Sequence, residues 1–336
     1  MGVERALFVT NMYPSQARPA YGIFVQRIAH AMEARGVEVR VEQIHGDSNR
    51  GDYYFARSRV AEACNTFRPN VVHVHFGWSF LAAATRAPRV VSFYGDDLNG
   101  IVRAPGRFSA LGHVGIGISQ LAAVRCERSV AVSEALRKRI WSSRARRNCT
   151  VVRDAVDQQL FTPGDRTTAR RRLGITDDRL RVLFPHSLAQ ATKRLDLAVA
   201  AIAALVEGGT HAELWIVNAA LPGEMPEYYR AADALIVTSE TEGGPSCVKE
   251  AMACGLPVVS VPVGDVATIA EAPGRAFIAP RDPRALANAI EAAIDVGKKD
   301  RSAYLPEYLT LGSASRRLLR VYDEAIAARL TASRQR

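Results

Sequence analysis

Segments of strand length recur along this chain, and most of them are apolar throughout and alternate with segments of helical periodicity. Such a pattern predicts parallel sheets that are covered by helices on both faces. The segments fall into two series, so we expect an α/β fold of two doubly wound domains that face a cleft. The predicted strands are 6–10, 37–44, 71–75, 90–94 and 129–133 in the first series, and 181–184, 213–217, 234–238 and 258–261 in the second.

Turn-forming residues interrupt this pattern near the middle of the chain, and their composition is typical of a linker. The length of 336 residues is also long for one domain. We therefore predict an N-terminal domain over 1–155, a linker over 156–168 and a second domain over 169–310. Apolar residues recur on one helical side of the last segment, 311–336, and we expect this helix to return toward the N-terminal domain.

Positive charge is concentrated in one part of the chain. The formal net charge is +10, and the stretch from Arg125 to Arg172 holds thirteen Lys or Arg against five Asp or Glu. We expect a basic helix over 134–147 with Trp141 at its apolar edge, a pattern that suits an anionic membrane surface. The alternative is a packed helix with a solvated arginine face. Nucleic acid is not an expected partner, because no recognition motif accompanies the charge.

Signals for targeting, disulfides and metals are missing from the sequence. It contains no run of about 18 apolar residues and no signal-peptide layout at its N-terminus. Five scattered cysteines lack metal-ligand spacing, so we expect free thiols and no metal site. These features predict a cytoplasmic protein, with peripheral attachment to the inner face of the membrane as an open alternative. The oligomeric state is not indicated.

A Gly-rich turn joins the predicted strand 234–238 to an alanine-rich helix, and two carboxylates flank it. Glu242 precedes Gly243 and Gly244, and Glu250 lies eight positions further on inside the helix. The first amides of a helix lack internal partners and carry partial positive charge, so such a turn favours an anion such as phosphate. The glutamates would then accept hydrogen bonds from sugar hydroxyls. The alternative is that both are solvated surface residues.

These motifs together resemble the retaining glycosyltransferases of family 4, enzymes of the GT-B fold with two Rossmann-like domains, over nearly the whole chain. The strongest match is 242–257, which is similar to the family's E-x7-E segment and the Glu-Ala-Met-Ala-x-Gly-x-Pro pattern that ends it. Weaker matches agree in order and spacing, namely 70–75, 132–136, 156–163, Lys193 and 263–265.

The resemblance implies transfer of a sugar from a nucleotide-sugar, most often a UDP- or GDP-sugar, to an acceptor hydroxyl with retained configuration. It implies no metal ion and no further cofactor. Glu242 would hold hydroxyls of the donor sugar near its anomeric carbon, Lys193 would bind the diphosphate, and Glu250 would bind the ribose. The other donor-binding candidates are Gly22, His186, Arg194, Gly243, Gly244, Pro245, Ser246 and Cys247.

The chain departs from the family pattern in the phosphate loop. The family carries an arginine about six residues before the lysine, and the stretch before Lys193 contains none. His186, Gln190 or Arg194 would have to compensate for the lost guanidinium, which binds phosphate in a bidentate manner.

The acceptor side departs as well, because Tyr94 stands where the family often has a histidine. Tyr94, Asp97 and His75 are the candidates that would line this side. A buried tyrosine and a capping aspartate are the alternative reading. His73 shares a strand face with His75, and we expect it to be packed or hydrogen-bonded.

We therefore expect a glycosyltransferase in cell-surface glycan, glycolipid or glycosylated-metabolite synthesis, with a sugar or lipid-linked acceptor. The alternative is a non-catalytic nucleotide-sugar-binding or scaffold protein of the same fold. A nicotinamide dehydrogenase is disfavoured, because Asn11-Met-Tyr-Pro follows the first strand instead of G-x-G-x-x-G. Other nucleotide-sugar enzymes, such as epimerases, stay open.

Overall fold

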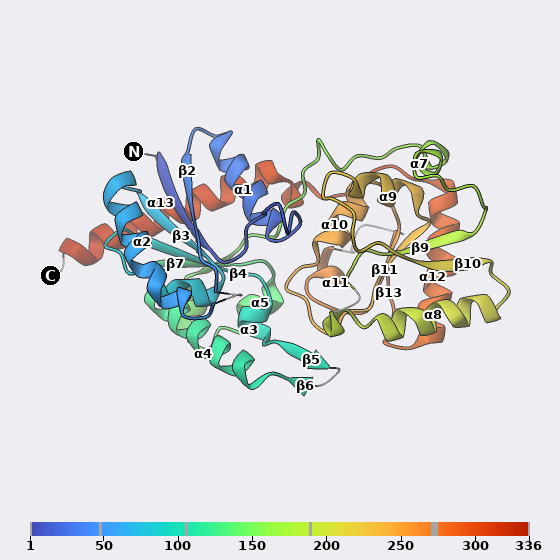
Figure 1. Ribbon diagram of the computed structural model, residues 1–336, viewed down its shortest axis with the longest axis horizontal. Helices are drawn as coiled ribbons and strands as arrows, with labels where there is room; N and C mark the ends of the chain where they lie inside the picture. The colour runs from blue at the N-terminus through green and yellow to red at the C-terminus, as the bar shows by residue number, and fades with distance from the viewer. Residues whose placement is uncertain (1, 47–48, 105–106, 188–189, 270–274, 335–336) are drawn as a thin grey trace. The chain divides into compact units, whose positions relative to one another are not determined.

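The computed structural model describes residues 2–46, 49–104, 107–187, 190–269 and 275–334 (Figure 1). The chain divides into two compact units. The first consists of Met1–Ile101, Phe108–Ala155 and Leu311–Arg336, and the second of Val102–Arg107 and Val156–Thr310.

The first unit contains a six-stranded parallel sheet in the order β2-β1-β3-β4-β7-β8. Successive residues of β1 serve opposite faces: Ala6 and Phe8 belong to one buried cluster, and Leu7 and Val9 to another. Burial on both faces explains why the central strands are largely apolar, whereas β2 at the edge alternates charged and apolar residues and is partly exposed. The strands are β1 Arg5–Thr10, β2 Glu38–Gln43, β3 Val71–His75, β4 Arg89–Phe93, β7 Arg128–Ala131 and β8 Cys149–Val151.

Helices cover both faces of this sheet. On the face of Phe8 lie α1 (Ile23–Glu33) and α13 (Leu311–Arg334), and Tyr322 of α13 is part of the same buried cluster. The C-terminal helix, red in Figure 1, therefore packs on the N-terminal unit, as predicted. The other face is covered by α2 (Asp52–Phe67) and α4 (Ala110–Arg125). Shorter elements of this unit are the 3-10 helix Gly77–Leu81, α3 Asp96–Asn99, α5 Glu134–Lys138 and α6 Ser143–Arg147. The strands β5 Val102–Ala104 and β6 Arg107–Phe108 pair in a separate two-stranded sheet, and Val102–Arg107 belongs to the second unit.

The second unit contains a five-stranded parallel sheet in the order β10-β9-β11-β12-β13. Its strands are β9 Leu180–Phe184, β10 Ala212–Ile216, β11 Ala234–Val237, β12 Val258–Ser260 and β13 Ala276–Ile278. Its helices are α7 Arg166–Arg172, α8 Leu195–Glu207, α9 Met225–Ala231, α10 Ser246–Ala253, α11 Val266–Ile269 and α12 Pro283–Lys299, with 3-10 turns at Ala191–Lys193 and Glu307–Leu309. The two parallel sheets confirm the predicted α/β class.

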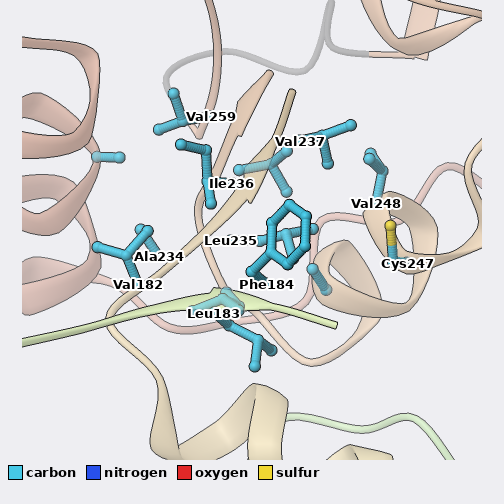
Figure 2. Close-up of a cluster of buried hydrophobic side chains, with 14 of the residues drawn as sticks. Val182, Leu183, Phe184, Ala234, Leu235, Ile236, Val237, Cys247, Val248 and Val259 are labelled. Atoms are coloured by element: carbon cyan, nitrogen blue, oxygen red, sulfur yellow. The ribbon is translucent and has the colours of Figure 1, made fainter. Parts of the chain in front are cut away.

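Apolar packing holds α10 against the strands of the second sheet. In Figure 2, Val248 and Cys247 of α10 lie in one cluster with Phe184 of β9 and Val237 of β11. Because these side chains are buried, the start of α10 is fixed at the end of β11.

The basic segment 134–147 is not one helix, and this prediction was wrong. Two short helices, α5 and α6, are separated by a turn, since Ser133 and Ser142 each accept a hydrogen bond from an amide three residues later and so start a new helix. Ile140 is buried in the turn, and the neighbouring Trp141 is 69% exposed. In the described part of the chain, no helix is long and apolar enough to cross a membrane.

Candidate functional site

The Gly-rich turn follows β11 and leads directly into α10, in agreement with the sequence prediction. Gly243 and Gly244 are buried, Ser246 is half-buried, and Pro245 occupies the N-cap position of the helix. A proline side chain has no acceptor that could satisfy the first amides of the helix. The turn therefore combines available amides with the positive end of the helix dipole, which suits an anion.

The two predicted catalytic side chains contact each other at this turn. The Lys193 ammonium donates to the Glu242 carboxylate at 2.6 Å, and both side chains are less than one-fifth exposed. Lys193 ends a 3-10 turn, and its carbonyl accepts a hydrogen bond from the Thr238 hydroxyl at 2.8 Å, next to β11. The two residues are 49 positions apart in the sequence, so the fold itself creates this pair.

Glu250 lies inside α10 and is almost completely buried. One of its carboxylate oxygens accepts a hydrogen bond from the Tyr229 hydroxyl of α9 at 2.9 Å. Burial first, and then the charge of Glu250, raises the pKa of Tyr229 well above its ordinary value, so the phenol keeps its proton and acts as the donor. This contact orients the carboxylate that was predicted to bind ribose.

His186 follows β9 and lies beside the same turn, with its Nε2 atom 3.9 Å from the Cys247 sulfur. Burial and the neighbouring Lys193 lower the pKa of His186 well below its ordinary value, so the imidazole is neutral at physiological pH. Burial raises the pKa of Cys247 to about 12, which keeps it a thiol. Neither group adds a charge to the site.

Arg194, another candidate to compensate for the missing family arginine, contacts two carboxylates. Its guanidinium donates to Asp196 at 2.9 Å and to Glu240 at 3.1 Å. These contacts hold the start of α8 near the residues that follow β11.

Sequence reasoning missed Lys249, the fourth residue of α10. Its side chain is fully buried, and the ammonium lies 3.7 Å from the Asp265 carboxylate. A Cβ atom added to Gly244 would lie 3.0 Å from the Lys249 Nζ and 3.2 Å from an Asp265 oxygen, so this ion pair accounts for the glycine. Lys249 directly follows the apolar residues Cys247 and Val248, and this context was the signal that could have revealed its burial.

Gly22, the donor-binding candidate of the first unit, caps α1 with a left-handed φ of 70°. A Cβ atom at this position would lie 2.3 Å from the carbonyl carbon of Met12. Both the conformation and the close approach require glycine here for backbone reasons alone.

The acceptor-side candidates, the buried His75 and the half-buried Tyr94, belong to one hydrogen-bond network. The two share a hydrogen bond of 2.5 Å, and the neighbouring His73 bonds to Ser92 and to Tyr322 of α13, each at 2.7 Å. The predicted packing of His73 is therefore confirmed. The network lines a small cavity of about 40 Å³ within the first unit. In the described part of the chain, the buried Nε2 of His75 has no hydrogen-bond partner.

Asp97 is fully buried at the start of α3 and accepts hydrogen bonds from the amides of Tyr94 at 3.1 Å and Gly95 at 3.0 Å. Burial raises the pKa of its carboxyl group to about 7. These contacts hold the backbone that leads into α3, whose N-cap position is occupied by Gly95 and not by Asp97.

Two family models match this chain in turn. The model described as Glycosyltransferase Family 4 matches residues 8–160, and the one described as Glycosyl transferases group 1 matches residues 179–295. Among curated relatives, a D-inositol 3-phosphate glycosyltransferase from Geodermatophilus obscurus is 33% identical over 182 residues, which are 44% of this chain and 40% of the relative. The chain spans about half the length of the curated relatives it matches.

Solved structures share the fold over nearly the whole chain. Sucrose-phosphate synthase from Thermosynechococcus elongatus has a TM-score of 0.70 at 17% identity and covers 98% of this chain and 97% of its own. HepE from Anabaena, in complex with UDP and glucose, has a TM-score of 0.60 at 17% identity, with 99% of each chain covered. The two matching family models, the parallel α/β architecture and the E-x7-E turn lead to one conclusion: the chain belongs to the family 4 glycosyltransferases, with the GT-B fold.

Proposed function

We propose that this protein transfers a sugar from a nucleotide-sugar to an acceptor hydroxyl with retained configuration and without a metal ion. The observation that carries the proposal is the 2.6 Å contact between Lys193 and Glu242 at a turn whose helix amides have no side-chain cap. This arrangement joins an ammonium and backbone donors, which suit a diphosphate, to a carboxylate, which suits sugar hydroxyls.

The proposed chemistry needs stabilisation of charge on the leaving group. As the bond between the anomeric carbon and the donor phosphate breaks, negative charge grows on the nucleoside diphosphate, where the amides of α10 and Lys193 stabilise it. The acceptor oxygen forms the new bond to the same carbon, and its proton passes to the leaving phosphate. Glu242 holds the sugar hydroxyls, and the buried Glu250, oriented by Tyr229, binds the ribose.

The donor is a UDP- or GDP-sugar under this proposal. The similarity to HepE, whose structure contains UDP and glucose, supports a uridine donor. The names of the curated relatives support an acceptor that is a hydroxyl of a phosphorylated polyol; a lipid-linked sugar is the other acceptor class. The buried carboxylates of Glu250 and Asp97 are already hydrogen-bonded within their own units.

A thermal-shift titration with UDP, GDP, ADP and their sugar conjugates tests the donor site. We expect one base to stabilise the protein selectively, and a transfer assay with that donor to release the nucleoside diphosphate. Nucleotide binding without release of the diphosphate by any acceptor would support the non-catalytic alternative. Absence of binding at millimolar concentration would contradict the donor site itself.

The first unit also supports a peripheral contact with an anionic membrane. On α4, Val114, Leu121 and Val124 are 55%, 46% and 57% exposed, and they lie on one helical side. The side chain of Gln120, also on α4, accepts from the amide of Trp141 at 2.9 Å, which brings the exposed tryptophan beside this helix. Exposed cations lie on both sides of the tryptophan in the sequence, namely Lys138, Arg139, Arg144 and Arg147.

Exposed apolar side chains next to a basic cluster are the composition of an interfacial membrane surface. Each cation near an anionic bilayer contributes about 1 kcal/mol. Reversal of three of them in Lys138→Glu/Arg139→Glu/Arg144→Glu should therefore abolish flotation with vesicles of phosphatidylglycerol and phosphatidylcholine. Arg284→Glu/Lys298→Glu/Lys299→Glu, three exposed cations on α12, is the matched control. Binding of heparin instead of vesicles by the wild type would contradict the membrane contact.

A further inference from the structure

A buried cation lies beneath the Gly-rich turn, and the proposed chemistry does not use it. Lys249 is the fourth residue of α10, and helical side chains lean toward the N-terminus of their helix. Its ammonium consequently reaches back to the turn, at 3.0 Å from the position a Cβ atom would take on Gly244. The lysine side chain has no exposed surface.

This position is unfavourable for a lysine that serves stability alone. A cation near the positive end of a helix is repelled by the helix dipole. Burial of an ammonium also costs free energy unless it is paired and hydrogen-bonded. The Asp265 carboxylate is 3.7 Å away, beyond hydrogen-bond distance, and within the described residues the Lys249 Nζ atom makes no hydrogen bond.

The turn is also held by the loop that carries Asp265. A Cβ atom on Gly264, which has a left-handed φ of 57°, would lie 3.2 Å from the carbonyl oxygen of Gly243 and 3.3 Å from the Pro245 ring. The two loops are thus in close contact, and the ion pair of Lys249 with Asp265 lies where they meet. A change in this pair should move the turn whose amides face the anion.

The neighbouring cationic candidates are engaged or neutral. Lys193 donates to Glu242, Arg194 contacts two carboxylates, and His186 is uncharged. The phosphate loop also lacks an arginine before Lys193. A second positive charge for a diphosphate has to come from elsewhere, and Lys249 lies under the right turn.

We propose that Lys249 is a positioning residue of the diphosphate site, an inference that rests on the proposed function. Its ammonium supports the Gly243–Pro245 turn from beneath and adds positive charge to the amides. Asp265 neutralises part of this charge, and a bound diphosphate neutralises it further. Lys249 acts through the turn and does not touch the reacting atoms.

Binding measurements with UDP, GDP, uridine and guanosine test this role by calorimetry. Lys249→Met keeps the length of the side chain and removes its charge, so affinity for the diphosphate should fall about tenfold, while affinity for the nucleoside stays unchanged. Lys249→Arg should restore most of the loss. Lys298→Met, on the exposed surface of α12, is the control for the same change in net charge.

Asp265→Asn is the sharper test, because a positioning role of the ion pair and a purely structural role predict opposite changes in diphosphate affinity. Loss of the carboxylate removes a repulsion, so diphosphate affinity should rise although the melting temperature falls. A purely structural pair would lower both quantities. If Lys249→Met fails to fold, Lys249→Met/Asp265→Asn removes both charges and should bind the diphosphate more weakly than Asp265→Asn alone. Equal affinity of these two variants would overturn the inference, whereas a wild type that binds no diphosphate would overturn the proposed function.

Discussion

The two units hold polar residues at the ends of buried strands in different ways. In the second unit, Lys193 and Glu242 form a partly exposed ion pair beside uncapped helix amides. In the first unit, His73 and His75 are fully buried and bond to hydroxyl groups of their own unit. The first arrangement is open to a charged ligand, and the second holds a helix on a sheet.

This difference separates residues that bind from residues that support. His73 bonds to Tyr322, so it fixes the C-terminal helix α13 on β3 and is satisfied without any ligand. Glu242 lies in a turn and contacts a residue from a distant loop, so its charge is held at a surface. We therefore expect substitutions in the second unit to change activity and substitutions in the His73 network to change stability.

The strongest test of this contrast is Glu242→Gln. An amide matches the shape of the carboxylate but lacks its charge, so turnover should fall about 100- to 1,000-fold, the range for loss of a transition-state contact. The melting temperature should stay near that of the wild type, and affinity for the diphosphate should not fall, because the variant also removes a negative charge beside Lys193. Steady-state kinetics and calorimetry measure both. Glu291→Gln, on the exposed surface of α12, is the control, and an equal loss of turnover there would remove Glu242 from its special role.

A smaller effect is expected from Lys193→Met. A hydrogen bond from a charged group contributes about 1.5–3 kcal/mol, so affinity for a nucleoside diphosphate should fall by about one to two orders of magnitude. Affinity for the nucleoside alone should not change, because the ammonium would contact the phosphates. Calorimetric titration of both ligands gives the answer. Weaker binding of the nucleoside as well would indicate a general distortion of the turn.

Much of this contrast could be predicted from the sequence, because local patterns carry it. The fully buried strands of both units appear as short apolar runs, and Glu242 and Glu250 belong to a turn with an ordered motif. The helix α4 was not predicted, since it is apolar on most sides and contains Gly112, Gly115 and Gly117, so it shows little helical periodicity. The basic segment was misjudged because two serine caps divide it.

Long-range packing explains the part of the site that the sequence did not reveal. The apolar residues beside Lys249 could have suggested that it is buried, but its pairing with Asp265 depends on the approach of a second loop. The engagement of Arg194 with Glu240 also depends on two loops 46 positions apart. Neither contact follows from composition, periodicity or spacing.

We expect the substitution His73→Phe to lower the free energy of unfolding. Phenylalanine leaves the buried Tyr322 hydroxyl without its histidine partner, which costs about 1–3 kcal/mol. Urea unfolding should show this loss, while nucleotide affinity stays unchanged. The double variant His73→Phe/Tyr322→Phe removes both polar groups and should recover part of the stability. A fall in nucleotide affinity in either variant would break the contrast between the units.

Acidification provides the mildest test of the same network. Burial lowers the pKa of His73 to about 3, so the folded protein binds this proton less readily than the unfolded chain does. The stability that depends on neutral His73 is fully present above the unfolded pKa of about 6.5 and is lost as the pH falls. Burial raises the pKa of Asp97 to about 7, which acts in the opposite direction over much of this range.

Measurement of the wild type and a control variant at each pH isolates the contribution of His73 to the pH dependence of stability, because Asp97 is present in both. The control variant His73→Phe/Tyr322→Phe lacks the titrating imidazole. Its unfolding free energy should therefore depend on pH less steeply than that of the wild type, by about 1.4 kcal/mol per unit between about pH 6 and pH 4. Urea unfolding at half-unit steps measures both slopes. Parallel curves would mean that His73 binds its proton as readily in the folded protein as in the unfolded chain. The network would then be accessible to solvent and not a buried support for α13.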